Sequence, residues 1–345
     1  MNTVNAAAPL QITLHDKIGH LGRPGSYPDF TSRVEVVETH MSVVFLTDAH
    51  VYKLKKPVRQ AYLDFSTLEA RRIDCLEEVR LNRRLAPSVY LGVVPLAAAA
   101  GGLVLEGSGT PVEWLVKMRR LPRAAMLDQA MSRGTVTPQD IERCMAVLCA
   151  FYVASPPSPL TARQYRERFA SEIASHRREL LSGAYRMPGA AVEAVAARLL
   201  RFVSDDAALL EARASAGRVI EAHGDLRPEH VCLGPDPVFI DCLEFDRDLR
   251  MLDTAGEAAY LALECDCAGC AQVARWVLAA YRAHAHDDAP DRLVAFHQGE
   301  RAMMRAKLAA WHLDDGLPAG ARTRWLERAG NYLAYADARS ATLYR

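Results

Sequence analysis

The chain has 345 residues, of which 50% are hydrophobic and 24% are charged, a composition typical of a globular protein with room for two lobes. Its 42 basic and 42 acidic side chains balance, which excludes the strong charge excess of proteins that bind nucleic acid or anionic membranes. No secretory signal is visible in Met1–Leu14, and the longest mostly apolar run, Val93–Leu105, is too short to span a bilayer. Eight cysteines without a regular framework suit a reducing compartment. We therefore predict a cytoplasmic protein with neither a nucleic-acid nor a membrane partner.

The first part of the chain predicts an antiparallel sheet. Residues 1–30 are polar and interrupted by Pro and Gly, and we expect this leader to pack on the sheet. Short runs rich in β-branched and aromatic residues follow, separated by polar turns, and predict a meander. Five strands are expected, at Val34–Glu38, Val43–Leu46, Val51–Lys55, Leu91–Val104 and Val112–Met118.

Two lysines stand out on the third predicted strand. Lys53 and Lys55 are two positions apart, so their side chains point to the same face. They could be lysines that protect an edge strand from aggregation, or they could be functional. The apolar neighbours of Lys53 favour it, and Lys55 is its close rival.

A helix is predicted after the third strand. Ser66 to Glu69 has the pattern of a capping box, and the helix should run to about Leu85. It carries Glu77 and Glu78, of which Glu78 shares a stripe with Leu81 and should point inward. The alternative is a solvated helix face.

The middle and the end of the chain are predicted to be helical. The helical pattern runs from Thr137 to Ala216, with breaks near Pro156–Pro159 and at Gly183. The last 80 residues also read as helices, and no motif there is assigned. Cys265, Cys267 and Cys270 form a C-x-C-x-x-C pattern that lacks the four ligands of a closed zinc site, so small buried thiols are expected.

The stretch from Val219 to Leu233 carries the densest set of reactive groups. A tight loop with Asp225 is followed by two apolar runs that flank the turn-rich 234–237, which predicts a β-hairpin. A pairing symmetric about the turn places His230 opposite Asp241, and opposed residues have Cβ atoms roughly 5 Å apart. We therefore expect Asp225, His230 and Asp241 to converge, as in a metal-phosphate site.

These residues resemble a known family. His223-Gly224-Asp225-Leu226, a polar residue five positions after the Asp, and Ile240-Asp241 at the far end of a hairpin are similar to the catalytic core of the aminoglycoside phosphotransferase-like kinases. The resemblance is to a bacterial branch that is often fused to a P-loop ATPase. It implies an α+β, two-lobed protein-kinase-like fold, with an N-lobe of antiparallel sheet plus helix and a mostly helical C-lobe that contains the catalytic hairpin.

The resemblance also implies a role for each residue. Asp225 would be the catalytic base, and Asp241 a metal ligand. His230 stands where that family has an Asn, which changes the expected metal site. Mg²⁺ prefers oxygen ligands, whereas imidazole suits softer transition metals, so one expected outcome is a shift toward Mn²⁺. His223 is interpreted as a buried support of the loop.

The resemblance also implies roles for residues of the first lobe. Lys53, with Lys55 as the alternative, would bind the phosphates of ATP and be held by Glu78. The stretch around Met118 would be the hinge that contacts the adenine. The predicted division is an N-lobe over 1–117, a hinge over 118–123 and a C-lobe over 124–345.

The acceptor is predicted to be a small molecule. Only eleven residues separate Asp241 from Asp253, which leaves no room for the activation segment of a protein kinase. Asp253 could cap the next helix or brace the catalytic loop, and Glu244 could support the metal or lie in an exposed turn. The carboxylates of Glu257, Glu264 and Asp266 are interpreted as a solvated helix face rather than a site for a cationic substrate.

The predicted activity is transfer of the γ-phosphoryl group of ATP to a hydroxyl of that small molecule, with Mg²⁺ or Mn²⁺ as cofactor. The alternative is a pseudokinase that binds nucleotide and regulates a partner, such as a P-loop ATPase. The chain contains no G-x-x-x-x-G-K-[ST] motif, so it is not itself that ATPase.

Overall fold

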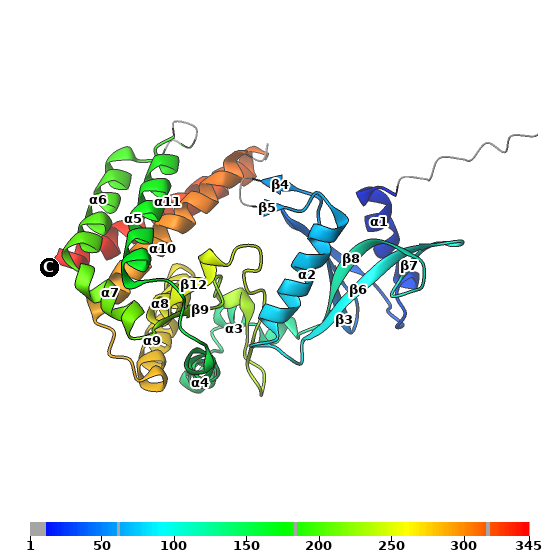
Figure 1. Ribbon diagram of the computed structural model, residues 1–345, viewed down its shortest axis with the longest axis horizontal. Helices are drawn as coiled ribbons and strands as arrows, with labels where there is room; N and C mark the ends of the chain where they lie inside the picture. The colour runs from blue at the N-terminus through cyan, green and yellow to red at the C-terminus, as the bar shows by residue number, and fades with distance from the viewer. Residues whose placement is uncertain (1–11, 61–62, 183–184, 186, 315–317, 345) are drawn as a thin grey trace, which may run out of the picture. The chain divides into compact units, whose positions relative to one another are not determined.

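The computed structural model of the chain describes residues 12–60, 63–182, 185, 187–314 and 318–344. The chain divides into two compact units. The first unit comprises the residues up to Pro122 together with Glu244–Asp246, and the second comprises Arg123–Leu243 and Arg247–Arg345. The predicted α+β architecture, a sheet-containing first part and a mostly helical second part, is confirmed (Figure 1).

The first unit is built on an antiparallel sheet in the order β1-β2-β3-β8-β6-β7. Its strands are β1 (Glu35–Glu38), β2 (Ser42–Leu46), β3 (His50–Lys55), β6 (Tyr90–Ala99), β7 (Gly102–Leu105) and β8 (Thr110–Arg119). A separate short pair is formed by β4 (Arg59–Gln60) and β5 (Leu63–Asp64). The first three strands form the predicted meander, because each pairs with the next in sequence.

The predicted count of five strands is wrong. The run expected as one strand over Leu91–Val104 is a hairpin, in which Ala99 of β6 pairs with Gly102 of β7. The run has no polar residue, and the prediction followed its continuous apolar pattern although the Gly101-Gly102 pair marks the turn. Gly102 has a φ of 118°, a backbone conformation that glycine adopts without steric cost and that allows the chain to reverse there.

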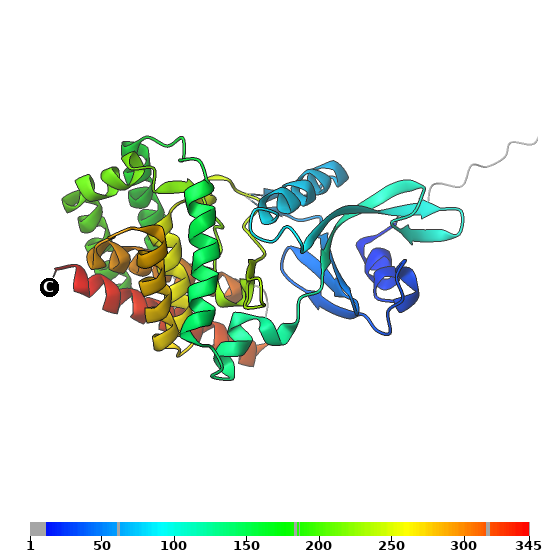
Figure 2. The same ribbon diagram turned by 90° about the horizontal axis from the view of Figure 1, so that it is seen from below.

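The two faces of the sheet are covered by different helices. Leu21 of α1 (Leu14–Leu21) packs in a core with Val43, Phe45 and Leu54, so the described part of the predicted leader does lie on the sheet. α2 (Leu68–Asn82) lies on the other face, the side to which Lys53 and Lys55 point (Figure 2). The alternation of side chains along β3 therefore separates an apolar face from a charged one.

α2 begins one residue later than predicted and ends three residues earlier. Its cap is Thr67, whose side chain accepts a hydrogen bond from the N–H of Ala70. Ser66 cannot take that place because its hydroxyl and its N–H both bond to Asp64. The predicted capping box with Glu69 is therefore wrong.

The second unit is mostly helical. Its helices are α3 (Leu127–Ser132), α4 (Pro138–Ala154), α5 (Ala162–Leu180), α6 (Gly189–Asp205), α7 (Ala207–Ser215), α8 (Thr254–Cys267), α9 (Ala271–Ala285), α10 (Asp291–Trp311) and α11 (Ala319–Ala341). α4 to α7 confirm the helical stretch predicted between Thr137 and Ala216, with the break after Ala154 where prolines were noted. Gly183, the other predicted break, lies outside the described residues. Short 3-10 turns occupy Pro24–Ser26, Arg123–Ala125, Pro228–His230, Asp248–Arg250, His312–Asp314 and Thr342–Tyr344.

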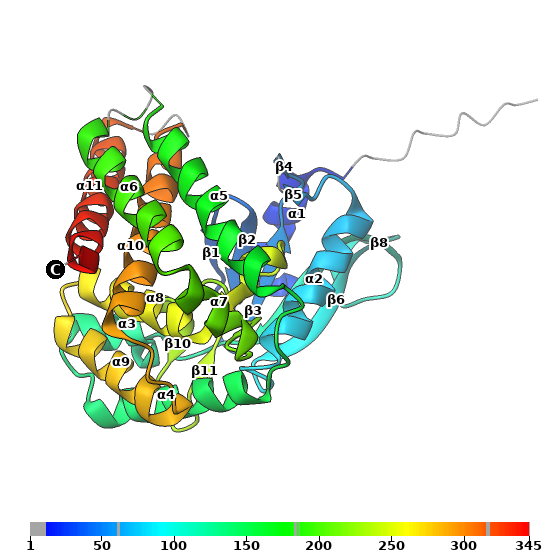
Figure 3. The same ribbon diagram turned by 60° about the vertical axis from the view of Figure 1, so that its left-hand side comes forward.

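α8 is the most deeply buried helix of those described in this unit. Every residue from Thr254 to Cys265 is buried. α9 and α10 pack against it (Figure 3). Because α8 is covered on several sides, its polar residues face other parts of the protein rather than solvent, which positions them to support the loop that carries Asp225.

Candidate active site

The loop that carries Asp225 starts from a small antiparallel sheet. β9 (Val219–Glu221) pairs with β12 (Met251–Asp253) immediately before α8. Gly224 then takes a φ of 89°, and a Cβ there would lie 3.0 Å from the Cβ of Leu243. Its N–H donates a 2.8 Å hydrogen bond to Glu257. Position 224 therefore requires glycine both for its backbone conformation and for the close approach of Leu243.

His223 supports this loop from inside, as predicted. Its Nε2 lies 2.9 Å from the carbonyl oxygen of Ile240, which can only accept, so Nε2 carries the proton. Its Nδ1 in turn accepts a hydrogen bond from the N–H of Asp225. Burial, reinforced by the nearby His230, lowers the pKa of His223 to about 4. The ring is therefore neutral, and it ties the loop to the hairpin strand that precedes Asp241.

The hairpin forms where predicted, with a register one residue away from the symmetric pairing. β10 (Val231–Cys232) pairs with β11 (Val238–Phe239), and Val231 lies opposite Phe239. The odd number of residues in the turn causes this difference. His230 nevertheless meets Asp241, with 3.5 Å between its Nε2 and a carboxylate oxygen.

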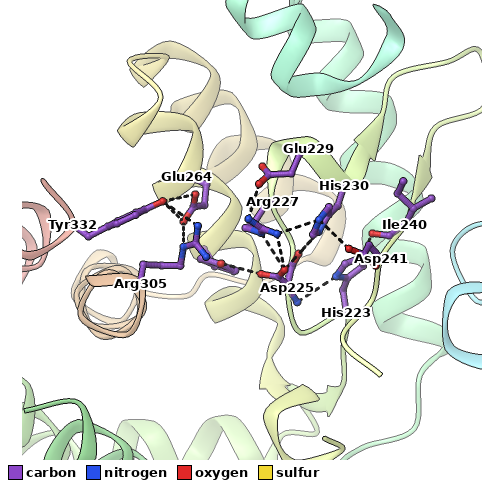
Figure 4. A network of polar contacts seen from close by, with 11 residues as sticks. His223, Asp225, Arg227, Glu229, His230, Ile240, Asp241, Glu264, Arg305 and Tyr332 are labelled. Carbon is purple, nitrogen blue, oxygen red and sulfur yellow. Dashed lines mark hydrogen bonds and ion pairs between the residues drawn. The ribbon is translucent and has the colours of Figure 1, made fainter. Parts of the chain in front are cut away.

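Asp225, His230 and Asp241 therefore converge, all within the second unit (Figure 4). Nδ1 of His230 lies 3.8 Å from the carboxylate of Asp225. Asp241 has a φ of 59°, a left-handed conformation that is costly for most residues but tolerated by Asp. This conformation directs the backbone out of the hairpin at the point where the carboxylate is presented.

The carboxylate of Asp225 is held by two side chains. Arg227 donates from Nε to one oxygen over 3.0 Å, and the hydroxyl of Tyr260 donates to the other over 3.1 Å. Burial by itself would raise the pKa of Asp225, but the electrostatic effect of its neighbours, above all the positive charge of Arg227, outweighs burial and lowers the pKa below its usual range. The Asp225 side chain is 29% exposed. It is an ionised, oriented and accessible carboxylate.

His230 is fixed in one tautomer if it is neutral. Its Nδ1 lies 2.8 Å from the carbonyl oxygen of Asp225, so Nδ1 carries the proton and Nε2 has the lone pair. A ring N–H bonded to a backbone carbonyl is the usual arrangement of a metal-binding histidine. However, Nε2 also lies 3.2 Å from a guanidinium nitrogen of Arg227. The site thus offers one carboxylate, Asp241, and one imidazole whose lone pair faces a cation.

Asp253 both caps α8 and braces the loop. Its carboxylate accepts from the N–H of Ala255 and forms a bidentate pair with Arg213, at 2.7 and 2.8 Å. Arg213 also pairs with Asp287. Since Asp253 is in the strand that pairs with β9, this buried network holds the start of the loop that carries Asp225. The two interpretations of Asp253 are therefore both correct.

The expected solvated face of α8 is wrong for two of its three carboxylates. Glu257 is buried and bonds to Gly224 and to the hydroxyl of Tyr152. Glu264 is buried and accepts from Tyr332, with Arg305 at 2.9 Å. Asp266 is partly exposed and lies near Arg339. The error arises because the sequence pattern cannot show that α9 and α10 cover this helix.

The first unit contains the predicted lysine–glutamate cluster. Glu78 is fully buried and contacts both lysines, Lys53 at 3.0 Å and Lys55 at 2.7 Å. Lys55 is only 1% exposed, and its ammonium group also contacts Asp74 at 2.5 Å and the carboxylate of Glu244. Burial alone would lower the pKa of Lys55, but the charges of Glu244 and Glu78 raise it above its usual value.

Three residues of these clusters escaped the sequence interpretation. Asp74 is one, and burial, aided by Glu244, raises its pKa to about 6 although Lys55 opposes the shift. Arg227 could have been noted from its position two residues after Asp225. Tyr260 is 35 residues from Asp225 and carries no sequence signal, because only the packing of α8 brings it there.

The structure also places Met118 of the predicted hinge and the cysteines of the C-x-C-x-x-C pattern. Met118 lies inside β8, paired with Val51 of β3 and Tyr90 of β6, and the strand ends at Arg119. Cys265 is buried as expected, but Cys267 is exposed, so the expectation of buried thiols is wrong for Cys267 because it lies at the end of α8. Among the described residues, no group of three His, Cys, Asp or Glu side chains forms a metal-binding cluster.

A cavity of about 320 Å³ lies beside the 3-10 turn that follows Arg227. Its walls include Glu229 from that turn, Asp128 from α3, Glu264 from α8, and Arg328 and Tyr332 from α11. All of these residues belong to the second unit. In the part of the chain that the structure describes, no helix is both long enough and apolar enough to cross a membrane.

Comparison with known proteins gives relatives in sequence and in structure. No family model matches the chain. Uncharacterized proteins of Mycobacterium tuberculosis (strain CDC 1551 / Oshkosh) and Mycobacterium bovis are 30% identical over 320 residues, which is 89% of this chain and 61% of each relative. The chain thus spans about three fifths of the length of the curated relatives it matches.

Solved structures share its fold at low sequence identity. An aminoglycoside phosphotransferase, a thermostable mutant in its apo form, has 11% identity and a TM-score of 0.52, covering 88% of this chain and 95% of its own. A choline/ethanolamine kinase family protein of Mesorhizobium loti has 12% identity and a TM-score of 0.51, covering 93% and 99%. LicA in complex with AMP has 14% identity and a TM-score of 0.51, covering 93% and 96%. The predicted protein-kinase-like fold is therefore confirmed.

Proposed function

We propose that the protein transfers the γ-phosphoryl group of ATP to a hydroxyl of a small molecule. The observation that carries this proposal is the convergence of Asp225, His230 and Asp241 at one end of a hairpin, with Asp225 ionised and held by two donors. The names of the solved structures with the same fold, which are phosphotransferases and small-molecule kinases, support it. Fold alone does not specify an acceptor.

Asp225 is the proposed base. Arg227 and Tyr260 fix the two oxygens of its carboxylate, so the remaining lone pairs are presented in a defined direction. A carboxylate in this position orients the acceptor hydroxyl and accepts its proton as the new bond to phosphorus forms. Positioning and charge neutralisation provide most of the rate in such reactions, which need few groups from the protein.

The residues present fit a divalent cation held mainly by Asp241. Mg²⁺ commonly binds through one or two carboxylates and completes its shell with water and phosphate oxygens. Asp241 offers an accessible carboxylate for this, with its side chain 46% exposed. A bound cation would neutralise phosphate charge. The lone pair of His230 favours a softer ion such as Mn²⁺ over Mg²⁺.

Lys53 and Lys55 are the proposed phosphate-binding residues of the first unit. Both are held by Glu78, which is the arrangement required for a lysine that positions phosphates. Lys53 is the more exposed of the two, at 13% against 1%. Its ammonium group is therefore the more accessible to a nucleotide, which supports Lys53 over Lys55 as the phosphate-binding residue.

The second candidate is a nucleotide-binding pseudokinase that regulates a partner, such as a P-loop ATPase. One contact favours it: the guanidinium of Arg227 lies 3.2 Å from Nε2 of His230. A cation in that position opposes binding of a metal ion through the same nitrogen. In this case nucleotide would bind without any requirement for metal.

Calorimetry with ATP separates the two candidates. Wild type and Asp241→Ala are titrated with ATP alone, with ATP plus Mg²⁺ and with ATP plus Mn²⁺. The proposed enzyme binds ATP more tightly with metal, and Asp241→Ala loses that gain. Asp236→Ala is the matched control, because Asp236 is an exposed residue in the turn of the same hairpin. Binding that is independent of metal supports the pseudokinase, and no binding contradicts both candidates.

A further inference from the structure

Arg301 is a mostly buried arginine close to the proposed base. It lies on α10, and its side chain is 14% exposed. Its guanidinium carbon is 5.6 Å from the centroid of the Tyr260 ring. The hydroxyl of the same Tyr260 bonds to Asp225, so one tyrosine contacts both the guanidinium and the carboxylate.

Among the described residues, Arg301 donates one hydrogen bond, to the sulfur of Met304, and none to an oxygen. Its contacts there are the ring of Tyr260, the sulfur of Met304 at 3.5 Å and the carboxylate of Glu300 at 3.7 Å. The last distance is too long for a hydrogen bond. A guanidinium has five N–H donors, so this side chain has donors available for an oxygen-bearing ligand.

Other arginines of this unit differ from Arg301. Arg213 donates to both Asp253 and Asp287, and Arg227 donates to Asp225 and Glu229. These arginines are committed to protein carboxylates at hydrogen-bond distance. A mostly buried cation without such partners is unusual, since nearly all buried polar groups are hydrogen-bonded.

The carboxylates near Arg301 are engaged elsewhere. Glu172 pairs with Nε of Arg168 at 3.0 Å, and Glu300 lies 3.4 Å from Nε2 of His176. Burial by itself would lower the pKa of Arg301, but Glu300 and Glu172 raise it above its usual value. The guanidinium is therefore charged, and its one ion pair with a carboxylate of the described residues, that with Glu300, is longer than a hydrogen bond.

We propose that Arg301 binds an anionic group, a carboxylate or a phosphate, on the hydroxyl-bearing acceptor. This inference rests on the proposed function, because it places the acceptor hydroxyl at Asp225. The planar guanidinium suits both groups, since it can donate two parallel hydrogen bonds to either. Arg301 then acts as a specificity-determining residue that selects acids over neutral or cationic alcohols.

Four probes on one three-carbon frame test this class of ligand. D-glycerate and sn-glycerol 3-phosphate carry the two anionic groups, glycerol is their neutral counterpart, and 3-amino-1,2-propanediol is the cationic one. Binding of each is measured by calorimetry without nucleotide, so the result does not depend on phosphoryl transfer. ADP release with each probe is then measured in the presence of ATP and Mg²⁺ or Mn²⁺.

The variants are Arg301→Gln and Arg301→Lys, with Arg324→Gln as control. Arg324 is an exposed arginine on α11. One or both anionic probes should bind wild type, and Arg301→Gln should weaken that binding about 10- to 100-fold, the usual effect of losing hydrogen bonds to a charged group. Arg301→Lys should retain part of the affinity, and Arg324→Gln all of it. A preference between the two acids identifies carboxylate or phosphate as the group bound.

The two measurements separate the inference from the function on which it rests. Anion binding that depends on Arg301, without ADP release for any probe, supports the anion site and counts against the phosphotransferase. ADP release with glycerol or the amine that Arg301→Gln leaves unchanged supports the phosphotransferase and overturns the inference. Equal anion affinity of wild type and Arg301→Gln, or no anion binding, also overturns it.

Discussion

Nδ1 of His230 donates a 2.8 Å hydrogen bond to the main-chain carbonyl of Asp225. The ring of His230 is therefore bonded to the main chain of the residue that carries the proposed base. This bond leaves Nε2 of the neutral ring to interact with Arg227 and Asp241. In the proposed enzyme, one imidazole therefore connects the proposed metal ligand Asp241 with the proposed base.

Replacing His230 by Asn should change the preferred metal. Wild type is expected to bind ATP more tightly with Mn²⁺ than with Mg²⁺, because its imidazole suits the softer ion. His230→Asn replaces the nitrogen ligand by an amide oxygen, and should shift the ratio of the two affinities toward Mg²⁺ by about tenfold. Calorimetry with each metal measures the ratio. If the variant loses nucleotide binding and ADP release with both metals, simple ligand replacement is wrong.

Replacing Arg227 by Gln should move the acid limb of the activity profile to higher pH. Of the groups that lower the pKa of Asp225, Arg227 has the largest effect. The base acts when deprotonated, so activity is lost as the pH falls through this pKa. Removing the positive charge raises the pKa, so the limb should move to higher pH. The dependence of kcat/KM for ADP release on pH measures it.

Arg166→Gln, a change in a partly exposed pair on α5, is the matched control for Arg227→Gln. It should leave the acid limb in place. An unchanged limb in Arg227→Gln would mean that Asp225 is not the titrating base.

His223 should make the protein less stable in mild acid. Its folded pKa of about 4 lies below the ordinary value of 6.5, so the unfolded chain binds a proton in a range where the folded protein does not. The contribution of this group to stability is complete above pH 6.5 and is lost as the pH falls toward 4. The loss amounts to about 3 kcal/mol.

Urea unfolding between pH 4 and 7 measures this loss. His223→Asn should lower stability at pH 7, and the variant should depend less on pH than wild type. His15→Gln changes an exposed histidine and should behave like wild type. An equally steep dependence in His223→Asn would show that other groups cause it.

Replacing Lys55 should mainly lower stability, whereas replacing Lys53 should mainly weaken nucleotide binding. Lys55→Met leaves the buried carboxylates of Asp74, Glu78 and Glu244 without their shared cation, and should lower the free energy of unfolding by about 3–5 kcal/mol. Lys53→Met removes one contact of Glu78, which Lys55 still neutralises, so the loss should be smaller. Urea unfolding compares the two.

The same variants identify the phosphate-binding lysine. Lys53→Met should weaken ATP binding in calorimetry while the protein remains folded. If Lys53→Met binds ATP normally and a folded Lys55→Met does not, Lys55 is the phosphate-binding residue and the order of preference is reversed.

The sequence by itself determined the local parts of this site. The alternation of β3 placed both lysines on one face, and the turn residues placed Asp241 near His230. These features depend on residues close together in the chain, whose geometry is set by backbone periodicity and turn chemistry.

Only the tertiary structure decided which distant groups surround Asp225. Tyr260 and Arg301 come from helices that show no motif, and Glu257 and Glu264 are buried by neighbours that the pattern of α8 does not reveal. The burial of Lys55 among three carboxylates depends likewise on α2 and on Glu244. Helical periodicity states which residues share a face, but the partner of that face is fixed by packing between segments far apart in sequence.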